Sequence, residues 1–81
     1  MLSLTFRSNR AVQEVIRRAQ AWFGPQGLGL NLLERGEGCV HFEGGGGFVT
    51  VTACPEKGGT RVELLAREWE GPAREFASSL G

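Results

Sequence analysis

The chain has 81 residues, which is enough for one domain and too few for two. Nine arginine and lysine residues balance nine glutamates, and this net charge of zero argues against a protein that binds nucleic-acid backbones and against an acidic interaction tail. Aspartate is absent, which removes the usual aspartate-based metal and nucleophile schemes. We therefore treat residues 1–81 as a single domain.

Membrane and secretion signals are the next features to consider. No apolar run approaches the ~20 residues that a membrane-spanning helix needs. The segment MLSLTFRSNR lacks the basic region and the long apolar core of a signal peptide. We expect a cytoplasmic protein without a membrane partner, in which Cys39 and Cys54 are reduced.

A helix is predicted over residues 8–24. Its apolar stripe recurs at helical spacing and consists of Val12, Val15, Ile16, Ala19, Trp22 and Phe23. We expect Ser8 or Asn9 to cap the helix, because their side chains can accept hydrogen bonds from its first amides. Glu14 and Arg18 are four residues apart and are expected to pair on its surface.

Five segments have the composition and alternation of strands: residues 2–7, 28–35, 39–43, 48–54 and 60–67. Glycine-bearing turns separate the last four, which predicts an antiparallel meander. The glycine run at residues 44–47 leads from strand to strand and is not followed by a helix or by Lys-Ser. We interpret it as a hairpin turn that needs positive φ, not as a phosphate-binding loop. An apolar stripe from Ala73 to Leu80 predicts a final helix, with Pro72 in its first turn.

The expected fold is α+β with the order β-α-β-β-β-β-α. We predict a five-stranded antiparallel sheet of order 2-3-4-5-1, with two helices packed on one face because each helix has a single apolar stripe. This element order is similar to that of TATA-binding-protein-like and helix-grip folds. The resemblance is one of topology over the whole chain, and fold alone does not carry function.

Period-two alternation sorts the strand residues into two faces. The face expected to meet the helices carries Leu28, Leu30, Leu32, Val40, Phe42, Val49, Val51, Ala53, Val62 and Leu64. The open face carries Asn31, Leu33, Cys39, His41, Glu43, Phe48, Thr50, Thr52, Cys54, Arg61, Glu63, Leu65 and Arg67. If Glu43 pairs with Phe48 across the turn, then His41 faces Thr50 on the next strand.

Cys39, His41 and Cys54 share the open face and are residue types that bind zinc. Their C-x-H spacing with one distant cysteine lacks the paired C-x₂-C of a structural site, so we predict no metal and no cofactor. A nucleophile pair of Cys39 and His41 is also disfavoured, because Cα atoms two strand residues apart lie about 6.5–7 Å from each other. We expect no catalytic residue and a protein that is not an enzyme.

The open face mixes apolar side chains with charges, as interaction surfaces do. Its candidate partner-binding residues are Leu33, Phe48, Leu65 and Arg61. The strand at residues 28–35 is expected to be a leucine-rich edge, without the proline or lysine that would discourage pairing. The leading hypothesis is a small non-enzymatic domain that forms a homodimer or binds a protein partner.

Two alternative functions remain open. A ligand-binding module would enclose a cavity between the sheet and the long helix, lined by Trp22, Phe23, Phe42, Trp69 and Phe76. Ordinary core packing would account for the same aromatic residues. Nucleic-acid binding through the open face would use Arg35, Phe48, Arg61 and Arg67. Glu43 and Glu63 lie among these residues and argue against it.

Overall fold

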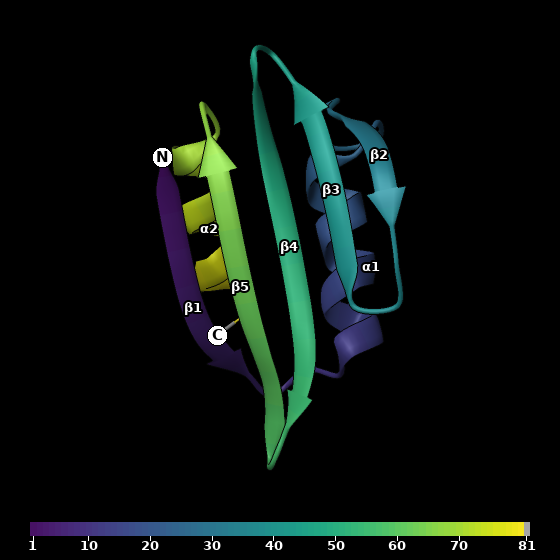
Figure 1. The fold of residues 1–81 in the computed structure, drawn as a ribbon, viewed down its shortest axis with the longest axis vertical. Coiled ribbons are helices and arrows are strands. Elements are labelled where there is room, and N and C mark those ends of the chain that lie inside the picture. Colours follow the sequence, from purple (N-terminus) through teal and green to yellow (C-terminus); the bar gives the residue numbers. More distant parts are fainter. Residues whose placement is uncertain (81) are drawn as a thin grey trace.

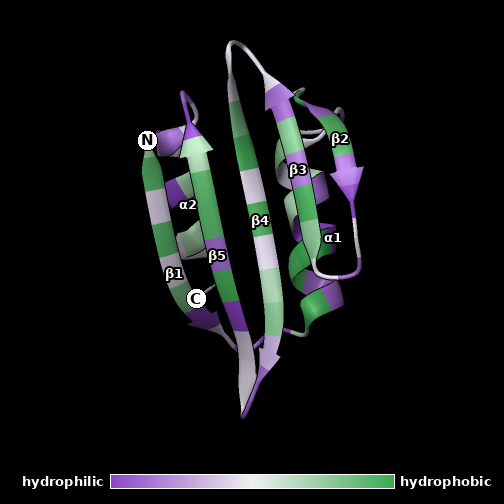
Figure 2. Ribbon diagram, in the orientation of Figure 1, coloured by the Kyte–Doolittle hydropathy of each residue, from purple (hydrophilic) through white to green (hydrophobic). Residues whose placement is uncertain are grey.

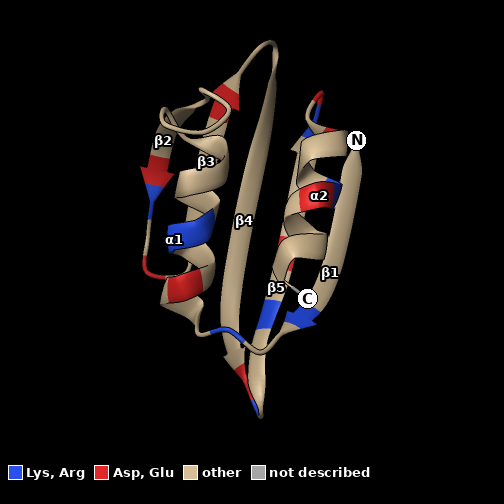
Figure 3. Cartoon of the chain, turned by 180° about the vertical axis from the view of Figure 1, so that it is seen from behind, with Lys and Arg blue, Asp and Glu red and all other residues tan. Residues whose placement is uncertain are grey.

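The computed structural model describes residues 1–80 and confirms the predicted element order. The elements are β1 (Leu2–Ser8), α1 (Val12–Phe23), β2 (Asn31–Arg35), β3 (Cys39–Gly44), β4 (Gly47–Glu56), β5 (Gly59–Arg67) and α2 (Glu70–Leu80). The strands form one antiparallel sheet of order β1-β5-β4-β3-β2, as predicted (Figure 1). Both helices lie on the same face of the sheet, with α1 over β3 and β4 and α2 over β5 (Figures 1 and 3).

The start of α1 differs from the prediction that Ser8 or Asn9 caps it. The N-cap residue is Ala11, and no side chain bonds to the first amides of the helix. Ser8 is buried at the end of β1, where its hydroxyl accepts a hydrogen bond from the Arg10 amide at 3.1 Å. The same hydroxyl donates to the carbonyl of Leu80 at 3.2 Å, so the serine joins β1 to the end of α2 instead.

The strand β2 begins at Asn31, later than predicted, because residues 24–30 turn back along the end of α1. The amides of Leu28 and Leu30 donate to the carbonyls of Trp22 and Phe23, each at 2.9 Å. Leu30 is buried as predicted, but Leu28 and Leu32 are 43% and 40% exposed. The prediction that these two leucines belong to the core is wrong, because α1 packs over β3 and β4 and leaves β2 beside it.

The remaining residues of the predicted inner face are all buried. In Figure 2 apolar and polar positions alternate along the strands, which is the pattern of a sheet with one covered face. The register of β3 with β4 is also the predicted one, with Glu43 opposite Phe48 and His41 opposite Thr50. Gly44 pairs with Gly47, and both central residues of the turn have positive φ, so the glycine run is a two-residue hairpin turn.

The centre of the core is a group of three fully buried phenylalanines. The ring of Phe23 lies 5.2 Å from that of Phe76 and 5.7 Å from that of Phe42, measured between centroids. Trp22 packs edge-on against Phe76 at 5.7 Å. These aromatic residues join α1 to both α2 and β3, so they pack against one another as part of the core.

No helix within residues 1–80 is long and apolar enough to cross a membrane.

Candidate functional site

His41 lies at the middle of the open face and has partners on three sides. Its Nδ1 is 2.7 Å from the Thr50 hydroxyl, and its Nε2 is 3.0 Å from a carboxylate oxygen of Glu43. The imidazole packs against the ring of Phe48 at 5.8 Å, and the Arg67 guanidinium lies 5.5 Å from the centroid of that ring. The sequence predicted that these side chains share a face, but not that they form one connected string.

The order of groups in this string, carboxylate, imidazole and hydroxyl, is the order that activates a nucleophile in hydrolases. Hydrolysis also requires amides that bind the developing oxyanion. Thr50 lies on β4, which pairs with β3 on one side and β5 on the other, so the amides of this strand are engaged in the sheet. The hydrogen bonds of this string therefore satisfy a half-buried imidazole, beside a strand whose backbone amides are engaged in the sheet.

The two cysteines are free thiols on the open face, Cys39 exposed and Cys54 half-buried. The Thr52 hydroxyl lies 3.9 Å from the sulfur of Cys39, while Cys54 is opposite Arg61 on the neighbouring strand. Within residues 1–80, no group of three or more histidine, cysteine or acidic side chains is close enough to hold a metal ion. The three zinc-ligand candidates share a face but do not form one cluster.

Of the four predicted partner-binding residues, Leu33 and Phe48 line one hollow on the open face, while Leu65 and Arg61 lie further away on β5. Leu33 and Leu65 are 54% and 37% exposed, but β3 and β4 lie between their strands. Phe48 is half-buried beside His41 and Arg67. Arg61 lies four residues along β5 from Leu65 and is 3.4 Å from Glu63, so its charge is already balanced.

The exposed apolar side chains gather instead at the outer edge of the sheet. Five large hydrophobic residues are exposed within residues 1–80, and three of them are Leu28, Leu32 and Leu33. Every residue of β2 is exposed. We call these three leucines, together with the free side of β2, the β2 edge.

Arg35 is not on the open face, where period two places it. The register between β2 and β3 shifts between Leu32 and Glu34, so Leu33 forms a β-bulge. Beyond the bulge Arg35 stands opposite the fully buried Val40, which places it on the face that the helices cover. The nucleic-acid hypothesis thereby loses one of its four residues, and Figure 3 shows charges of both signs interspersed over the helix side.

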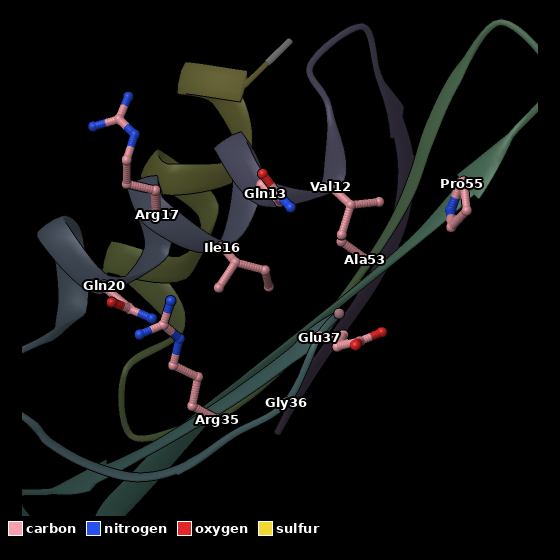
Figure 4. A pocket seen from close by; sticks show the side chains of 11 residues that line it. Val12, Gln13, Ile16, Arg17, Gln20, Arg35, Gly36, Glu37, Ala53 and Pro55 are labelled. Atoms are coloured by element: carbon pink, nitrogen blue, oxygen red, sulfur yellow. The ribbon is translucent and has the colours of Figure 1, made fainter.

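A groove opens where Arg35 reaches the helix face. It has a volume of about 1160 Å³ and lies between α1 and the turn that joins β2 to β3, with β4 as its floor (Figure 4). Its lining residues are Val12, Gln13, Ile16, Arg17, Gln20, Arg35, Gly36, Glu37, Gly38, Ala53 and Pro55. Sequence reasoning missed this groove, because the bulge that directs Arg35 into it leaves no distinct sequence signal.

The ion pairs beside the groove affect one of its arginines. Arg17 and Arg18 donate hydrogen bonds to the carboxylate of Glu14, the closest at 2.7 and 2.8 Å. The hydrogen bonds from Arg17 and then Arg18 hold the pKa of Glu14 below its usual value. The charge of Arg17 is therefore offset, whereas Arg35 forms no ion pair within residues 1–80.

No protein-family model, curated protein or solved structure matches the chain. The fold and these surfaces define a small α+β domain with a five-stranded antiparallel sheet, one covered face and one exposed, apolar edge. Function is therefore inferred from the geometry of the edge and the groove.

Proposed function

We propose that the chain is a non-enzymatic binding module that forms a homodimer through the β2 edge. The observation that carries this proposal is the exposure of every residue of β2, which includes Leu32 toward the helix-covered face and Leu33 toward the open face, together with the exposed Leu28 just before the strand. An edge strand has unpaired backbone groups on its free side, and exposed apolar side chains beside them favour association. The element order also supports a TATA-binding-protein-like or helix-grip-like topology as part of this proposal.

Charge favours a second copy as the occupant of the edge. The chain has no net charge, so two copies do not repel each other, and β2 itself carries one glutamate and one arginine. A contact with two-fold symmetry uses the same surface of both copies, and no further copy can join at that surface once the dimer has formed. It would set the β2 edge of one copy against the β2 edge of the other.

The β-bulge at Leu33 determines the kind of contact. A bulge bends its strand and interrupts the regular spacing of backbone groups, which disfavours a continuous ladder with another strand. Leucine side chains therefore carry most of the contact. Burial of these side chains gains free energy in proportion to the apolar area that the contact covers. Because a small contact must also offset the lost freedom of two molecules, we expect a weak, concentration-dependent dimer.

The test is sedimentation equilibrium of the wild type and two matched variants, from about 10 µM to about 1 mM. Leu33→Glu places a charge at the β2 edge and should give a monomer over the whole range, while the wild type approaches the mass of a dimer. Leu65→Glu makes the same change on the open face, on β5, with β3 and β4 between it and the β2 edge, and this variant should still dimerise.

A wild-type chain that stays monomeric at about 1 mM would contradict the proposed dimer. Loss of the dimer in Leu65→Glu but not in Leu33→Glu would move the contact to the open face.

A further inference from the structure

The groove between α1 and the β2–β3 turn combines an apolar wall with polar groups. Val12 and Ile16 of α1 face it from one side, and Ala53 and Pro55 of β4 lie below it (Figure 4). Its volume of about 1160 Å³ is ample for a small molecule, since such sites usually measure roughly 300–1,000 Å³. An apolar wall of this kind accepts the apolar body of a ligand.

Arg35 supplies the one cation of the groove that has no partner. Its guanidinium forms neither an ion pair nor a side-chain hydrogen bond with any of residues 1–80. The β-bulge at Leu33 is what directs it to the helix face, and bulges are common where a strand must re-aim a side chain beside a site.

Gln20 adds a second donor without an acceptor. Its side-chain Nε2 is shielded from solvent and has no hydrogen-bond partner among the described residues. A buried donor that remains unpaired is unfavourable, so such an atom calls for a partner. In Figure 4 the amide of Gln20 and the guanidinium of Arg35, both of which line the groove, are drawn beside one another at one end of it. An acceptor placed between them would satisfy both.

The other charged residues of the groove do not occupy the space next to Arg35 and Gln20. Arg17 is held by Glu14, and its guanidinium points away from the groove in Figure 4. The carboxylate of Glu37 also extends away from Arg35. Arg35 and Glu37 are thus the two charges of the lining without an ion pair, and because they extend apart, only the end of the groove at Arg35 favours an anion.

We propose that this groove binds a small organic carboxylate with an apolar body. The carboxylate accepts hydrogen bonds from the Arg35 guanidinium, whose planar fork matches its two oxygens, and from Nε2 of Gln20. The apolar body lies along Val12 and Ile16. The proposal is independent of dimer formation, because the β2 edge is not part of the groove's lining apart from Arg35.

Titration with decanoate, and with decanol as the uncharged analogue, tests the proposal by ¹⁵N NMR on the intact chain. Decanoate is expected to shift the amides of residues 12–20 and 35–38 and to bind more tightly than decanol. Arg35→Met keeps an unbranched, flexible stem but removes the guanidinium and its charge. The variant should bind decanoate about tenfold more weakly or worse, since a hydrogen bond to a charged group contributes about 1.5–3 kcal/mol. Its affinity for decanol should be unchanged.

Two further variants separate this site from other effects. Gln20→Met should also weaken the binding of decanoate. Arg74→Met, which removes an exposed arginine of α2, should leave the affinity for decanoate unchanged. Each variant is first checked for an unchanged melting temperature.

Equal affinity for decanoate and decanol, or an Arg35→Met variant that binds decanoate as tightly as the wild type, would overturn the proposal. Amide shifts confined to residues outside the groove would overturn it as well.

Discussion

The glycines at residues 44–47 meet two different physical requirements at neighbouring positions. Gly45 and Gly46 have φ of 58° and 80°, the left-handed region that a tight hairpin needs and that side chains disfavour. Gly47 has an ordinary φ, but a Cβ at this position would overlap the Arg67 carbonyl oxygen and come within 2.6 Å of the Cβ of Glu68. The sequence indicated the turn, whereas only the close approach of β5 accounts for the fourth glycine.

This difference leads to a prediction at the residue scale. Gly47→Ala should reduce the free energy of unfolding by about 1–3 kcal/mol, because β4 and β5 must separate to admit the methyl group. Gly71→Ala is the matched control, since a Cβ there meets nothing within 4 Å and the residue lies in α2. It should be neutral or stabilising by up to about 1 kcal/mol. Urea denaturation measures both, and equal stability of the two variants would contradict the close contact.

At the scale of the element, α1 is held by its packing and its surface pairs and not by a cap. No side chain caps its first turn, while Val15, Ile16, Ala19 and Phe23 are buried against the sheet. Glu14 bonds to Arg17 as well as to Arg18, so the predicted pair is present but shares its carboxylate with a second arginine. The two arginines act on one carboxyl group, whose protonation should therefore affect the helix.

The predicted consequence is a pH dependence of a definite sign. The pKa of Glu14 is lowered in the folded chain, so its contribution to stability is complete above the ordinary value of 4.5 and is lost as the pH falls through the lowered value. Carboxyl NMR titration should place the pKa of Glu14 below the ordinary value of 4.5, and Arg17→Ala should raise this pKa more than Arg18→Ala does. A Glu14 that titrates at or above 4.5 would contradict these ion pairs.

At the scale of the whole molecule, one aromatic group links both helices to the sheet. A chain of this size has a total stability of about 4–12 kcal/mol. Phe76 is fully buried and contacts both Trp22 and Phe23 of α1, so it fixes α2 over the sheet. Loss of this ring would remove a large part of the stability of the fold.

Phe76→Ala should lower the free energy of unfolding by about 3–5 kcal/mol, through lost burial and the cavity that remains. Phe76→Leu should cost less, because it keeps most of the volume, and Glu75→Ala, a neighbouring exposed position, should change stability by about 0.5 kcal/mol at most. Urea denaturation monitored by circular dichroism gives the three values. An alanine variant as stable as the glutamate variant would show that α2 is not needed for the core.

The sequence by itself determined the order of the elements, the order of the strands and the register of β3 with β4. These features follow from periods of two and 3.6 residues and from turn glycines, which act over a few neighbouring residues. The same local rules placed His41, Thr50 and Glu43 on one face. They also placed Leu33 and Leu65 there, although the distance between those two leucines depends on how many strands separate them.

Only the tertiary structure decided which side chains are exposed at the β2 edge and which line the groove. The position of α1 over β3 and β4 exposed Leu28 and Leu32, and the β-bulge at Leu33 turned Arg35 from the open face into the groove. Both depend on contacts between residues far apart in the chain, because the place of a helix on a sheet and the extra residue of a bulge are settled by packing as a whole. A pattern read along the chain carries no information about either.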